Sequence, residues 1–215
     1  MIAPPPAAVY HGQVRRDVFA LVAKGDRLLD LGGGTGATAR ELKRIGRCRY
    51  VGVIDGISDH VADLDFAATG DLDQPGQIVQ LATAHGPFDT ILCLDVLEHL
   101  RAPESVLTEV LTALSPGGQL VASIPNVRHV SVIVPLLLRG RWDYADTGVL
   151  DRTHLRFFTR SSARALIEGA GFRIDRIVPS ATATRWQRLG NLLTLGLLRD
   201  LFTIQYYIVA HRSSC

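Results

Sequence analysis

Glycines recur at every second position directly after a short apolar run that contains an acid. The run Arg27–Leu31 holds Asp30, and Gly32, Gly34 and Gly36 follow it before a segment that favours helix. Glycine has no Cβ and tolerates positive φ, so this spacing predicts a tight turn that a ligand can approach closely. The free N–H groups and the positive dipole end of the following helix would face that ligand. A glycine-rich turn without a ligand is the alternative interpretation.

The acid beside the turn distinguishes two classes of ligand. A dinucleotide-binding turn uses G-x-G-x-x-G/A, and residues 34–39 fit that pattern loosely. Residues 30–36 fit D-x-G-x-G-x-G better. A carboxylate at the end of the strand repels a pyrophosphate but helps to hold a cationic ligand. The sequence therefore favours a cationic ligand over an NAD(P) cofactor.

Three further acids, Asp55, Asp71 and Asp95, follow the ends of predicted strands. Asp55 comes 19 residues after Gly36, close to where nucleotide-binding folds place an acid that accepts hydrogen bonds from the ribose hydroxyls. Because ligands bind outside the carboxyl ends of parallel strands, we expect all of these acids at one crevice. An aspartate that merely caps a turn or a helix is the alternative for Asp55.

Histidine is the side chain best suited to remove a proton from a hydroxyl near neutral pH. His154 lies in a polar segment at the expected mouth of the site and is the preferred general base. His99 and His129 are the alternatives. A structural His154, bonded to a backbone carbonyl, is the non-catalytic interpretation.

A metal site is a further alternative. Asp95, Glu98 and His99 are spaced i, i+3, i+4, so a helix would place them on one face. These oxygen and nitrogen donors suit a divalent cation such as Mg²⁺ or Mn²⁺. No resident metal is expected.

Arginines and aromatic residues gather in the longest interruption of the strand–helix pattern. We predict that residues 125–160 form a lid over the acceptor side of the site, and we call this segment the lid. Its aromatic side chains suit stacking on an acceptor ring or sugar, and its arginines suit bidentate phosphate contacts. Core packing and solvated charge are the structural alternatives. The side chains are Trp142, Tyr144, Phe157, Phe158, Arg139, Arg141, Arg152 and Arg156.

Apolar runs and helical spacings alternate along the rest of the chain, which predicts an α/β fold with a doubly wound parallel sheet. The expected strands are residues 27–31, 50–54, 65–69, 88–94, 119–124, 172–178 and 203–210. The expected helices are residues 10–23, 37–45, 75–84, a segment from 103, 161–170 and 186–202. A turn is expected at residues 115–118.

Composition agrees with a single domain spanning residues 1–215, since 47% of the residues are hydrophobic. Three cysteines without metal spacing, no signal peptide and no apolar run of transmembrane length indicate a cytoplasmic protein. Residues 1–125 carry 10 basic and 15 acidic side chains, against 13 and 6 in residues 126–215. This asymmetry suits a cationic cofactor and an anionic acceptor, or is simply solvated surface charge.

Several motifs in one order resemble a known family. D-V-L-E-H-L at 95–100, S-I-P-N-V-R-H at 123–129, G-R-W-x-Y at 140–144 and G-x-L-D-R-T-H-L-R-F-F-T at 148–159 accompany the glycine motif. The chain thus resembles class I S-adenosylmethionine (SAM) dependent methyltransferases, and within them a bacterial subgroup often found beside glycosyltransferases. The resemblance implies a Rossmann-like sheet of seven strands, mostly parallel with an antiparallel last strand, and helices on both faces.

The resemblance also implies which residues contact the cofactor. Gly32, Gly34 and Gly36, next to Asp30, would line the methionine part of SAM. Leu94 and Asp95 would lie beside the methyl centre. The remaining implied contacts are Asp55 with the ribose, Asp71 and the Leu72 backbone with the adenine edge, and Tyr10 and Arg16 over the cofactor, with Arg16 a candidate for the SAM carboxylate.

Two details qualify these assignments. Asp55 stands one position later than the acid of the family pattern, which makes Asp59 the fallback for the ribose. Ubiquinone-pathway O-methyltransferases and small-RNA 2′-O-methyltransferases carry E-x-x-E-H with a later histidine and bind a divalent cation. In this chain the resemblance makes Asp95 the first acid of that motif and His154 the candidate for the later histidine.

Three function classes follow from the sequence. The first is a SAM-dependent methyltransferase that acts on a hydroxyl of a small-molecule or glycan acceptor, phosphorylated or not, with no nucleic acid expected as partner. The second is an NAD(P)-dependent oxidoreductase, which Asp30 and the D-V-L-E-H-L motif disfavour. The third is a non-catalytic SAM-binding partner subunit, which a lid with His154 disfavours. The oligomeric state is not predicted.

Overall fold

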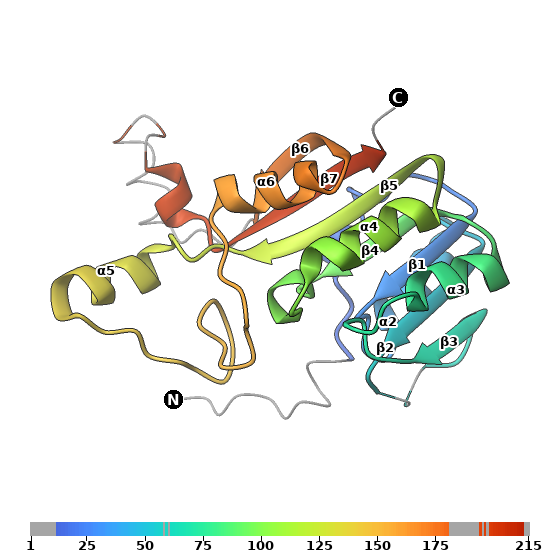
Figure 1. Cartoon of the computed structure of the whole chain (residues 1–215), viewed down its shortest axis with the longest axis horizontal. Coiled ribbons are helices and arrows are strands. Elements are labelled where there is room, and N and C mark those ends of the chain that lie inside the picture. The colour runs from blue at the N-terminus through green and yellow to red at the C-terminus, as the bar shows by residue number, and fades with distance from the viewer. Residues whose placement is uncertain are drawn as a thin grey trace.

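The computed structural model describes residues 12–57, 59, 61–180, 194, 196 and 198–212, and these residues form one mixed sheet of seven strands (Figure 1). The order across the sheet is β3-β2-β1-β4-β5-β7-β6. β7 runs opposite to the other six strands of this sheet, which confirms the predicted mostly parallel arrangement with an antiparallel last strand. The strands are β1 (Arg27–Leu31), β2 (Tyr50–Asp55), β3 (Phe66–Thr69), β4 (Phe88–Leu94), β5 (Leu114–Pro125), β6 (Phe172–Pro179) and β7 (Gln205–Arg212).

Helices cover both faces of the sheet, as predicted for a doubly wound fold. One apolar core joins the sheet to α3, α4 and α6, and a second joins its other face to α2 and the segment after η1. The helices are α2 (Ala37–Arg44), α3 (Gln77–His85), α4 (Pro103–Ala113), α5 (Val130–Arg139) and α6 (Arg160–Gly169), with short 3₁₀ turns η1 (Arg16–Val18), η2 (Leu97–His99) and η3 (Arg199–Phe202).

The central strands are apolar on both faces because both faces are covered. In β1, Leu28 lies in one core and Leu29 in the other, and in β4 Ile91 and Leu92 divide in the same way. Continuous apolar runs of this kind are typical of buried parallel strands. This is why the sequence located β1 and β4 well.

The N-terminal helix expected over residues 10–23 is wrong for the described part of that range. Only η1, a single 3₁₀ turn, forms there. Val18 and Val22 in this range are nevertheless buried in the second core. The backbone N–H of Arg15 donates to Thr38 Oγ1 at 3.1 Å instead of entering a helical ladder, which holds the segment across the start of α2. Tyr10 lies outside the described residues.

Two other expectations change at the C-terminal half of the sheet. β5 extends back to Leu114, which pairs with Phe88, so residues 115–118 belong to an irregular strand and not to a separate turn. Most of the helix expected over residues 186–202 lies outside the described residues. The part that is described ends in the 3₁₀ turn η3.

The lid consists of α5 and an irregular segment that returns to the body of the protein (Figure 1). The backbone N–H groups of Leu155 and Arg156 donate to the Glu98 carbonyl at 2.8 and 3.0 Å. The N–H of Val127 donates to the Phe158 carbonyl at 2.9 Å. The returning segment is therefore attached to η2 by backbone hydrogen bonds. Among the described residues, no helix combines the length and apolar character needed to cross a membrane.

Gly52 in β2 provides a test of how tightly the sheet is packed. A Cβ at Gly52 would lie 1.9 Å from the ring of Phe66, which in turn stacks on His85 with ring centroids 3.8 Å apart. We expect Gly52→Ala to lower the free energy of unfolding by about 1–3 kcal/mol, because the stacked ring has to move. Urea unfolding followed by circular dichroism measures the change.

Gly169 is the matched control for that substitution. It ends α6, and a Cβ added to it would have nothing within 4 Å. Gly169→Ala should raise the free energy of unfolding by about 0.5–1 kcal/mol, since alanine loses less backbone entropy on folding. Equal effects of the two substitutions would contradict the packing argument.

Candidate functional site

The glycine turn has the geometry that its spacing predicts. Gly32, Gly34 and Gly36 have φ of 62°, 57° and 81°, in the left-handed region that favours glycine. A Cβ at Gly32 or Gly36 would also lie 2.6 Å from the side chain of Val96 or Leu64. Gly36 is the N-cap of α2 and makes no side-chain cap, so the first N–H groups of the helix are open to a ligand at this edge.

Asp55 holds the glycine turn in place. Its Oδ2 accepts a hydrogen bond from the Gly34 N–H at 2.8 Å, and its Oδ1 accepts one from the Ile57 N–H at 3.1 Å. The predicted ribose ligand thus lies next to the turn, and each of its oxygens keeps a further lone pair. Its contact with a ribose stays a prediction.

Asp30 lies beneath the turn as a buried carboxyl. It is 1% exposed, and neither oxygen has a hydrogen-bond partner among the described residues. A Cβ at Gly33 would lie 2.6 Å from the Asp30 Cγ, so the turn closes directly over this group. Burial and the nearby Asp55 raise the pKa of Asp30 to about 7, although Arg15 opposes the shift. A cationic ligand above the turn would favour its ionised form.

Asp95 connects several segments at the same edge. It follows β4 with a positive φ of 56°. Its carboxylate accepts hydrogen bonds from the Arg15 guanidinium, from the Gln205 side-chain amide and, at 2.8 Å, from Ser123 Oγ. Burial lowers the pKa of Arg15, but the nearby Asp95 and the hydrogen bond that Arg15 donates to Asp17 outweigh it and raise that pKa. Arg15 is therefore a fixed cation at the carboxyl end of β4.

Arg15, and not Arg16, reaches the carboxylate at the end of β4. The side chain of Arg16 is 76% exposed and lies 3.8 Å from Glu41 Oε1, on the outside of α2. The contact of Arg16 with the cofactor was implied by the family resemblance, and it stays a prediction. Two neighbouring arginines in the sequence were the available signal, but the spacing alone did not distinguish them.

The other expected cofactor contacts lie along the same edge. Asp71 follows β3 and accepts a hydrogen bond from the Asp73 N–H at 3.0 Å, while its side chain is exposed. Leu72 is partly buried after β3, and Leu94 is partly buried at the end of β4. The Gly70 N–H donates to the Asp55 carbonyl at 2.9 Å, which joins the ends of β2 and β3. Asp59 is exposed.

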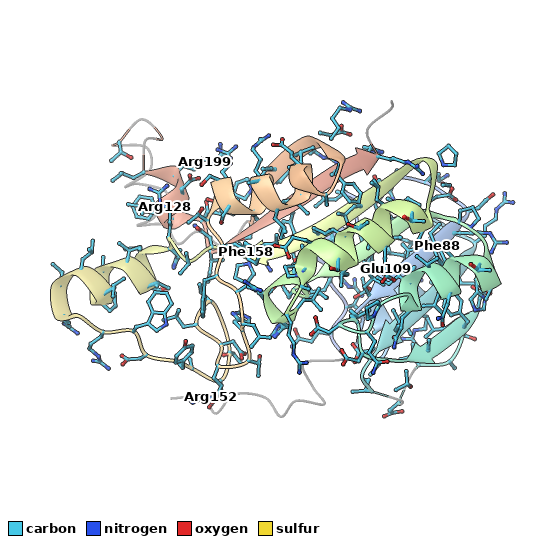
Figure 2. The ribbon with its side chains drawn as sticks, viewed as in Figure 1. Phe88, Glu109, Arg128, Arg152, Phe158 and Arg199 are labelled. Carbon is cyan, nitrogen blue, oxygen red and sulfur yellow. The ribbon has the colours of Figure 1, made fainter. Side chains whose placement is uncertain are left out.

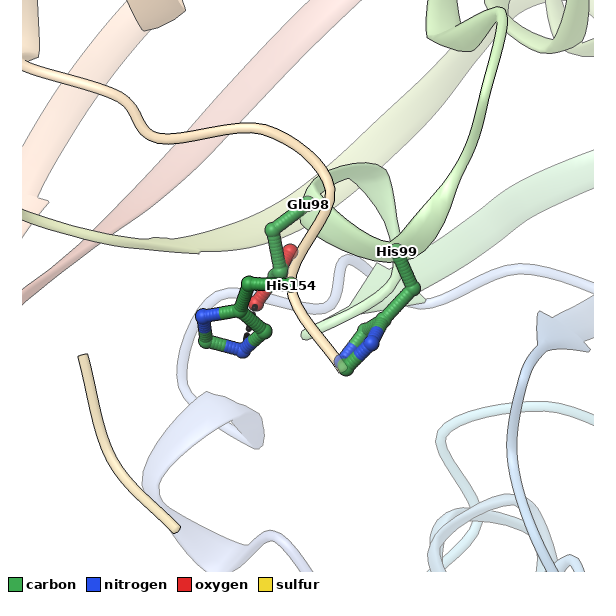
Figure 3. Close-up of side chains that lie close together, drawn as sticks. All are labelled: Glu98, His99 and His154. Carbon is green, nitrogen blue, oxygen red and sulfur yellow. Dashed lines mark ion pairs between the residues drawn. The ribbon is translucent and has the colours of Figure 1, made fainter. Parts of the chain in front are cut away.

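A cluster of three possible ligand side chains lies just beyond this edge. One ligand atom each of Glu98, His99 and His154 lies within 4.8 Å of the others, and Figure 3 shows the two rings turned toward the carboxylate. His154 Nε2 lies 4.0 Å from Glu98 Oε1. The two imidazole rings meet edge to face, with centroids 4.7 Å apart.

Backbone contacts orient both histidines. His154 Nδ1 lies 3.1 Å from the Val149 carbonyl, so the N–H is at Nδ1 and the lone pair of the neutral ring is at Nε2. His99 Nδ1 lies 3.3 Å from the Thr153 carbonyl. The backbone contact of His154 is the one that a structural role would require, and it also leaves Nε2 available as a base or as a metal ligand.

Glu98 is the electrostatic centre of this cluster. It is 1% exposed, and neither carboxylate oxygen has a hydrogen-bond partner among the described residues. Burial and the nearby Asp95 raise the pKa of Glu98 well above its usual range. Burial and His154 lower the pKa of His99, which favours its neutral form. A buried carboxylate without a partner is costly unless a cation pairs with it.

Asp95 does not join this cluster. Residues 97–99 form a 3₁₀ turn, so the i, i+3, i+4 spacing does not place Asp95 beside Glu98 and His99 as an α-helix would. The Asp95 carboxylate is directed to Arg15 and Gln205 instead. Of the four ligands considered from the sequence, Asp95 therefore does not lie with Glu98, His99 and His154.

His129 has a structural role. It is the N-cap of α5, where its Nδ1 accepts a hydrogen bond from the Ser131 N–H at 3.3 Å. Burial lowers its pKa. As a helix cap it is no longer a good alternative to His154 as general base.

The lid aromatics divide into two groups. Trp142 meets Phe157 edge to face with centroids 5.2 Å apart, and Phe157 lies 6.2 Å from the His154 ring. Tyr144 is 50% exposed and lies near the Phe157 ring. Phe158 packs against the main core, as its structural interpretation requires. Trp142 and Tyr144 thus gather around Phe157, which lies beside His154.

The lid arginines do not converge on one point. Arg141 pairs with Asp143 at 2.6 Å, and Arg152 pairs with Asp146 at 2.9 Å. The Arg156 guanidinium donates to the Arg101 carbonyl. Local pairing leaves these three side chains less available for a phosphate than the sequence suggested.

The raised pKa of Asp30 makes a prediction about stability. The folded protein keeps the Asp30 proton to about pH 7, whereas the unfolded chain loses it near 3.8. The free energy of unfolding should therefore fall between about pH 4 and pH 7, by at most about 4 kcal/mol, relative to Asp30→Asn. Urea unfolding at a series of pH values measures this difference. Asp26→Asn, at the exposed start of β1, should give a curve parallel to that of the wild type.

Comparisons with known proteins place this geometry in a family. Residues 10–177 match the model of the methyltransferase domain. A ubiquinone biosynthesis O-methyltransferase of Xylella fastidiosa is 32% identical over 136 residues, which cover 57% of this chain and 54% of the relative. One of Xanthomonas euvesicatoria is 28% identical over 167 residues, which cover 71% and 65%. The chain thus spans about half the length of the first of these relatives.

Solved structures show the same fold. A SAM-dependent methyltransferase of Archaeoglobus fulgidus aligns with a TM-score of 0.62 at 20% identity, covering 92% of this chain and 91% of the other. One of Mesorhizobium loti aligns with a TM-score of 0.61 at 18% identity, covering 94% and 99%. The predicted methyltransferase family and its fold are confirmed. The chain belongs to the methyltransferase domain family.

Proposed function

We propose that this chain transfers the methyl group of SAM to a hydroxyl of a small-molecule acceptor. The observation that carries the proposal is the cluster of Glu98, His99 and His154, which begins three residues after Asp95 at the end of β4. A cluster of nitrogen and oxygen ligands beside the cofactor edge suits a reaction in which an oxygen has to lose a proton. The names of the relatives, O-methyltransferases, support an oxygen acceptor.

The cofactor edge suits a cationic amino acid nucleoside. The glycine turn approaches closely without a Cβ, Asp30 supplies negative charge beneath it, and Asp55 borders it. Arg15 supplies the positive group for the SAM carboxylate in place of Arg16. Asp71 lies at the end of β3, where the adenine would lie. Methyl transfer needs these groups chiefly to align the reactants and exclude water.

Glu98, His99 and His154 fit a divalent cation better than the sequence suggested. Their chemistry is a mixed oxygen and nitrogen set, and the Glu98 carboxylate has no other partner among the described residues. Such a cation would lower the pKa of an acceptor hydroxyl and orient its oxygen. The carbonyls of Val149 and Thr153 hold the two rings in position for this role.

A metal-free mechanism is the second candidate. The Val149 contact leaves the lone pair of His154 at Nε2, which is the state that a general base requires. In that case His154 accepts the hydroxyl proton directly, and Glu98 at 4.0 Å stabilises the charged ring. The two mechanisms differ in whether chelation abolishes activity.

The lid favours an acceptor with a flat or ring-shaped face. Trp142, Tyr144 and Phe157 lie around the approach to His154 and suit stacking on a phenolic ring or on a sugar. A glycan acceptor, which the glycosyltransferase-associated subgroup would imply, remains part of the proposal. The paired lid arginines give a phosphorylated acceptor less support.

Whether Arg15 or Arg16 binds the carboxylate of the cofactor can be tested directly. Arg15→Gln should weaken the binding of S-adenosylhomocysteine by at least about tenfold, the scale of one lost charged hydrogen bond. Arg16→Gln should leave the affinity unchanged, because that side chain faces solvent. Isothermal titration calorimetry measures both, and the thermal midpoint checks that each variant is folded. The reverse ranking would return the role to Arg16.

The cation site predicts chelator-sensitive activity. Release of S-adenosylhomocysteine, with 3,4-dihydroxybenzoate and UDP-glucose as acceptor probes, should fall at least about tenfold after EDTA treatment and recover with Mg²⁺ or Mn²⁺. His154→Ala should lower turnover at least about a hundredfold while S-adenosylhomocysteine binding stays near that of the wild type. Unchanged turnover in His154→Ala would remove His154 from catalysis.

Electron paramagnetic resonance can measure Mn²⁺ binding, and this tests the cation site without an acceptor. Glu98→Gln, His99→Ala and His154→Ala should each weaken Mn²⁺ binding at least about tenfold. The control is His211→Ala. It removes a histidine of β7 that pairs with Asp175 and is not part of the cluster. Activity that survives EDTA, together with no Mn²⁺ binding, would select the metal-free mechanism with His154 as base.

A further inference from the structure

The segment of the lid that carries His154 also contacts His99 through a hydroxyl. His99 Nδ1 lies 3.2 Å from Thr153 Oγ1 and 3.3 Å from the Thr153 carbonyl oxygen. Figure 3 shows the two histidine rings side by side, one from η2 and one from the returning segment. Neither the proposed base nor the proposed ligand set uses the Thr153 hydroxyl.

The carboxylate of Asp151 holds that hydroxyl. Asp151 Oδ1 accepts a hydrogen bond from Thr153 Oγ1 at 2.6 Å and another from the Thr153 N–H at 2.8 Å. An ionised carboxylate only accepts hydrogen bonds, so the hydroxyl proton of Thr153 is directed to Asp151. Because a hydroxyl has a single proton, Thr153 Oγ1 can then only accept a hydrogen bond from His99.

These contacts decide which nitrogen of His99 carries the proton. The two oxygens of Thr153 near His99 Nδ1 both act as acceptors. A neutral imidazole has one N–H and one lone pair, so the N–H of His99 is at Nδ1 and its lone pair is at Nε2. His154 has the same arrangement through the Val149 carbonyl. Both rings of the cluster therefore keep the lone pair on Nε2.

Asp151 also contributes to the position of His154. Its carbonyl oxygen accepts a hydrogen bond from the His154 N–H at 3.1 Å. The residue between Asp151 and Thr153 is directed the other way, since Figure 2 shows Arg152 at the outer end of the returning loop, where it pairs with Asp146. Asp151 and Thr153 are thus the members of this turn that reach the cluster.

We propose that Asp151 is a positioning residue, which acts through the Thr153 hydroxyl to hold the N–H of His99 at Nδ1 and leave the Nε2 lone pair free. This role rests on the proposed function, because it serves the reaction only where His99 binds a cation. Metal-binding histidines commonly donate their other N–H to a carboxylate or a carbonyl, which fixes the tautomer and the direction of the ring. In this cluster the carboxylate acts through one intervening hydroxyl.

The carboxylate matters because a free hydroxyl has two possible roles. Without Asp151, the Thr153 hydroxyl can rotate and donate its proton to His99 Nδ1. The lone pair of His99 would then be at Nδ1, occupied by the hydroxyl, and the N–H would be at Nε2. Neither nitrogen could bind a cation in that state. The Thr153 carbonyl would still favour the original tautomer, so the loss of Asp151 should mix the two forms.

Nitrogen-15 nuclear magnetic resonance reports the tautomer of His99 in the metal-free protein. At about pH 8 the ring is neutral, and the ¹⁵N shifts distinguish the protonated nitrogen from the one with the lone pair. The signals of His99 are those absent from His99→Ala. The wild type should have the N–H at Nδ1. Asp151→Ala should lower the ratio of the Nδ1–H form to the Nε2–H form about fivefold, the scale of one neutral hydrogen bond.

Two further variants separate this role from a general disturbance of the turn. Asp151→Asn keeps an oxygen that accepts from the Thr153 hydroxyl, so it should keep the tautomer of the wild type. Adding Thr153→Val to Asp151→Ala removes the hydroxyl that would donate to His99, so the Nδ1–H form should recover in part. A turn that had merely lost its shape would not recover in the double variant. The thermal midpoint checks that each variant is folded.

Mn²⁺ binding, measured by electron paramagnetic resonance, connects the tautomer to the cluster. Asp151→Ala should weaken Mn²⁺ binding about tenfold, although Asp151 is not one of the clustered ligands. Thr153→Ser, which keeps the hydroxyl, should bind Mn²⁺ as the wild type does.

The two measurements distinguish this proposal from the proposed function. If the wild type binds no Mn²⁺ while the tautomers change as expected, the cation site is wrong and the positioning role of Asp151 is supported. If His99 carries its N–H at Nε2 in the wild type, or if Asp151→Ala leaves the tautomer unchanged, the positioning role is wrong whether or not Mn²⁺ binds.

Discussion

The arrangement of the site depends on one carboxylate, that of Asp95. It lies at the end of β4, the strand next to β1 in the middle of the sheet, and it binds side chains from the N-terminal segment, from β5 and from β7. The β5–β7 pair is antiparallel, so Ser123 and Gln205 reach the same edge from opposite chain directions. By accepting from Arg15, Asp95 also fastens the N-terminal segment over the start of α2. The cofactor edge is thus assembled from distant parts of the chain.

The residues that follow Asp95 connect that edge to the acceptor side. The Glu98 carbonyl binds the backbone of Leu155 and Arg156, which brings His154 beside the Glu98 side chain. That side chain and Asp30 are the two buried carboxyls without a hydrogen-bond partner in the described part of the protein. Both cost folding free energy, and both lie where a positively charged ligand is proposed. A fold that tolerates such groups at a site, and not elsewhere, indicates that ligand binding offsets the cost.

The sequence predicted the sheet well because continuous apolar runs and glycine turns are local signals. β4 was predicted with its observed bounds, and the left-handed glycines at 32, 34 and 36 followed from their spacing. Where the prediction was wrong, contacts between residues far apart in the sequence were the cause. The helical spacing of residues 10–23 suggested a helix, but the backbone N–H of Arg15 bonds to Thr38 instead, and its side chain reaches Asp95. The 3₁₀ geometry of η2 separated Asp95 from Glu98, which no spacing rule for α-helices could show.

The uneven charge of the chain also has a structural explanation. The acidic first half contributes Asp30, Asp55, Asp95 and Glu98, which surround the edge where a sulfonium ligand and a divalent cation are proposed. Arg15 is a basic residue in this acidic half. It is the group proposed to bind the carboxylate of the cofactor. The basic second half contributes the lid, where Arg141 and Arg152 are paired locally while Arg139 stays exposed at the tip of α5. Overall charge near neutrality therefore conceals an edge of the sheet that is rich in acids and a lid that is richer in arginines.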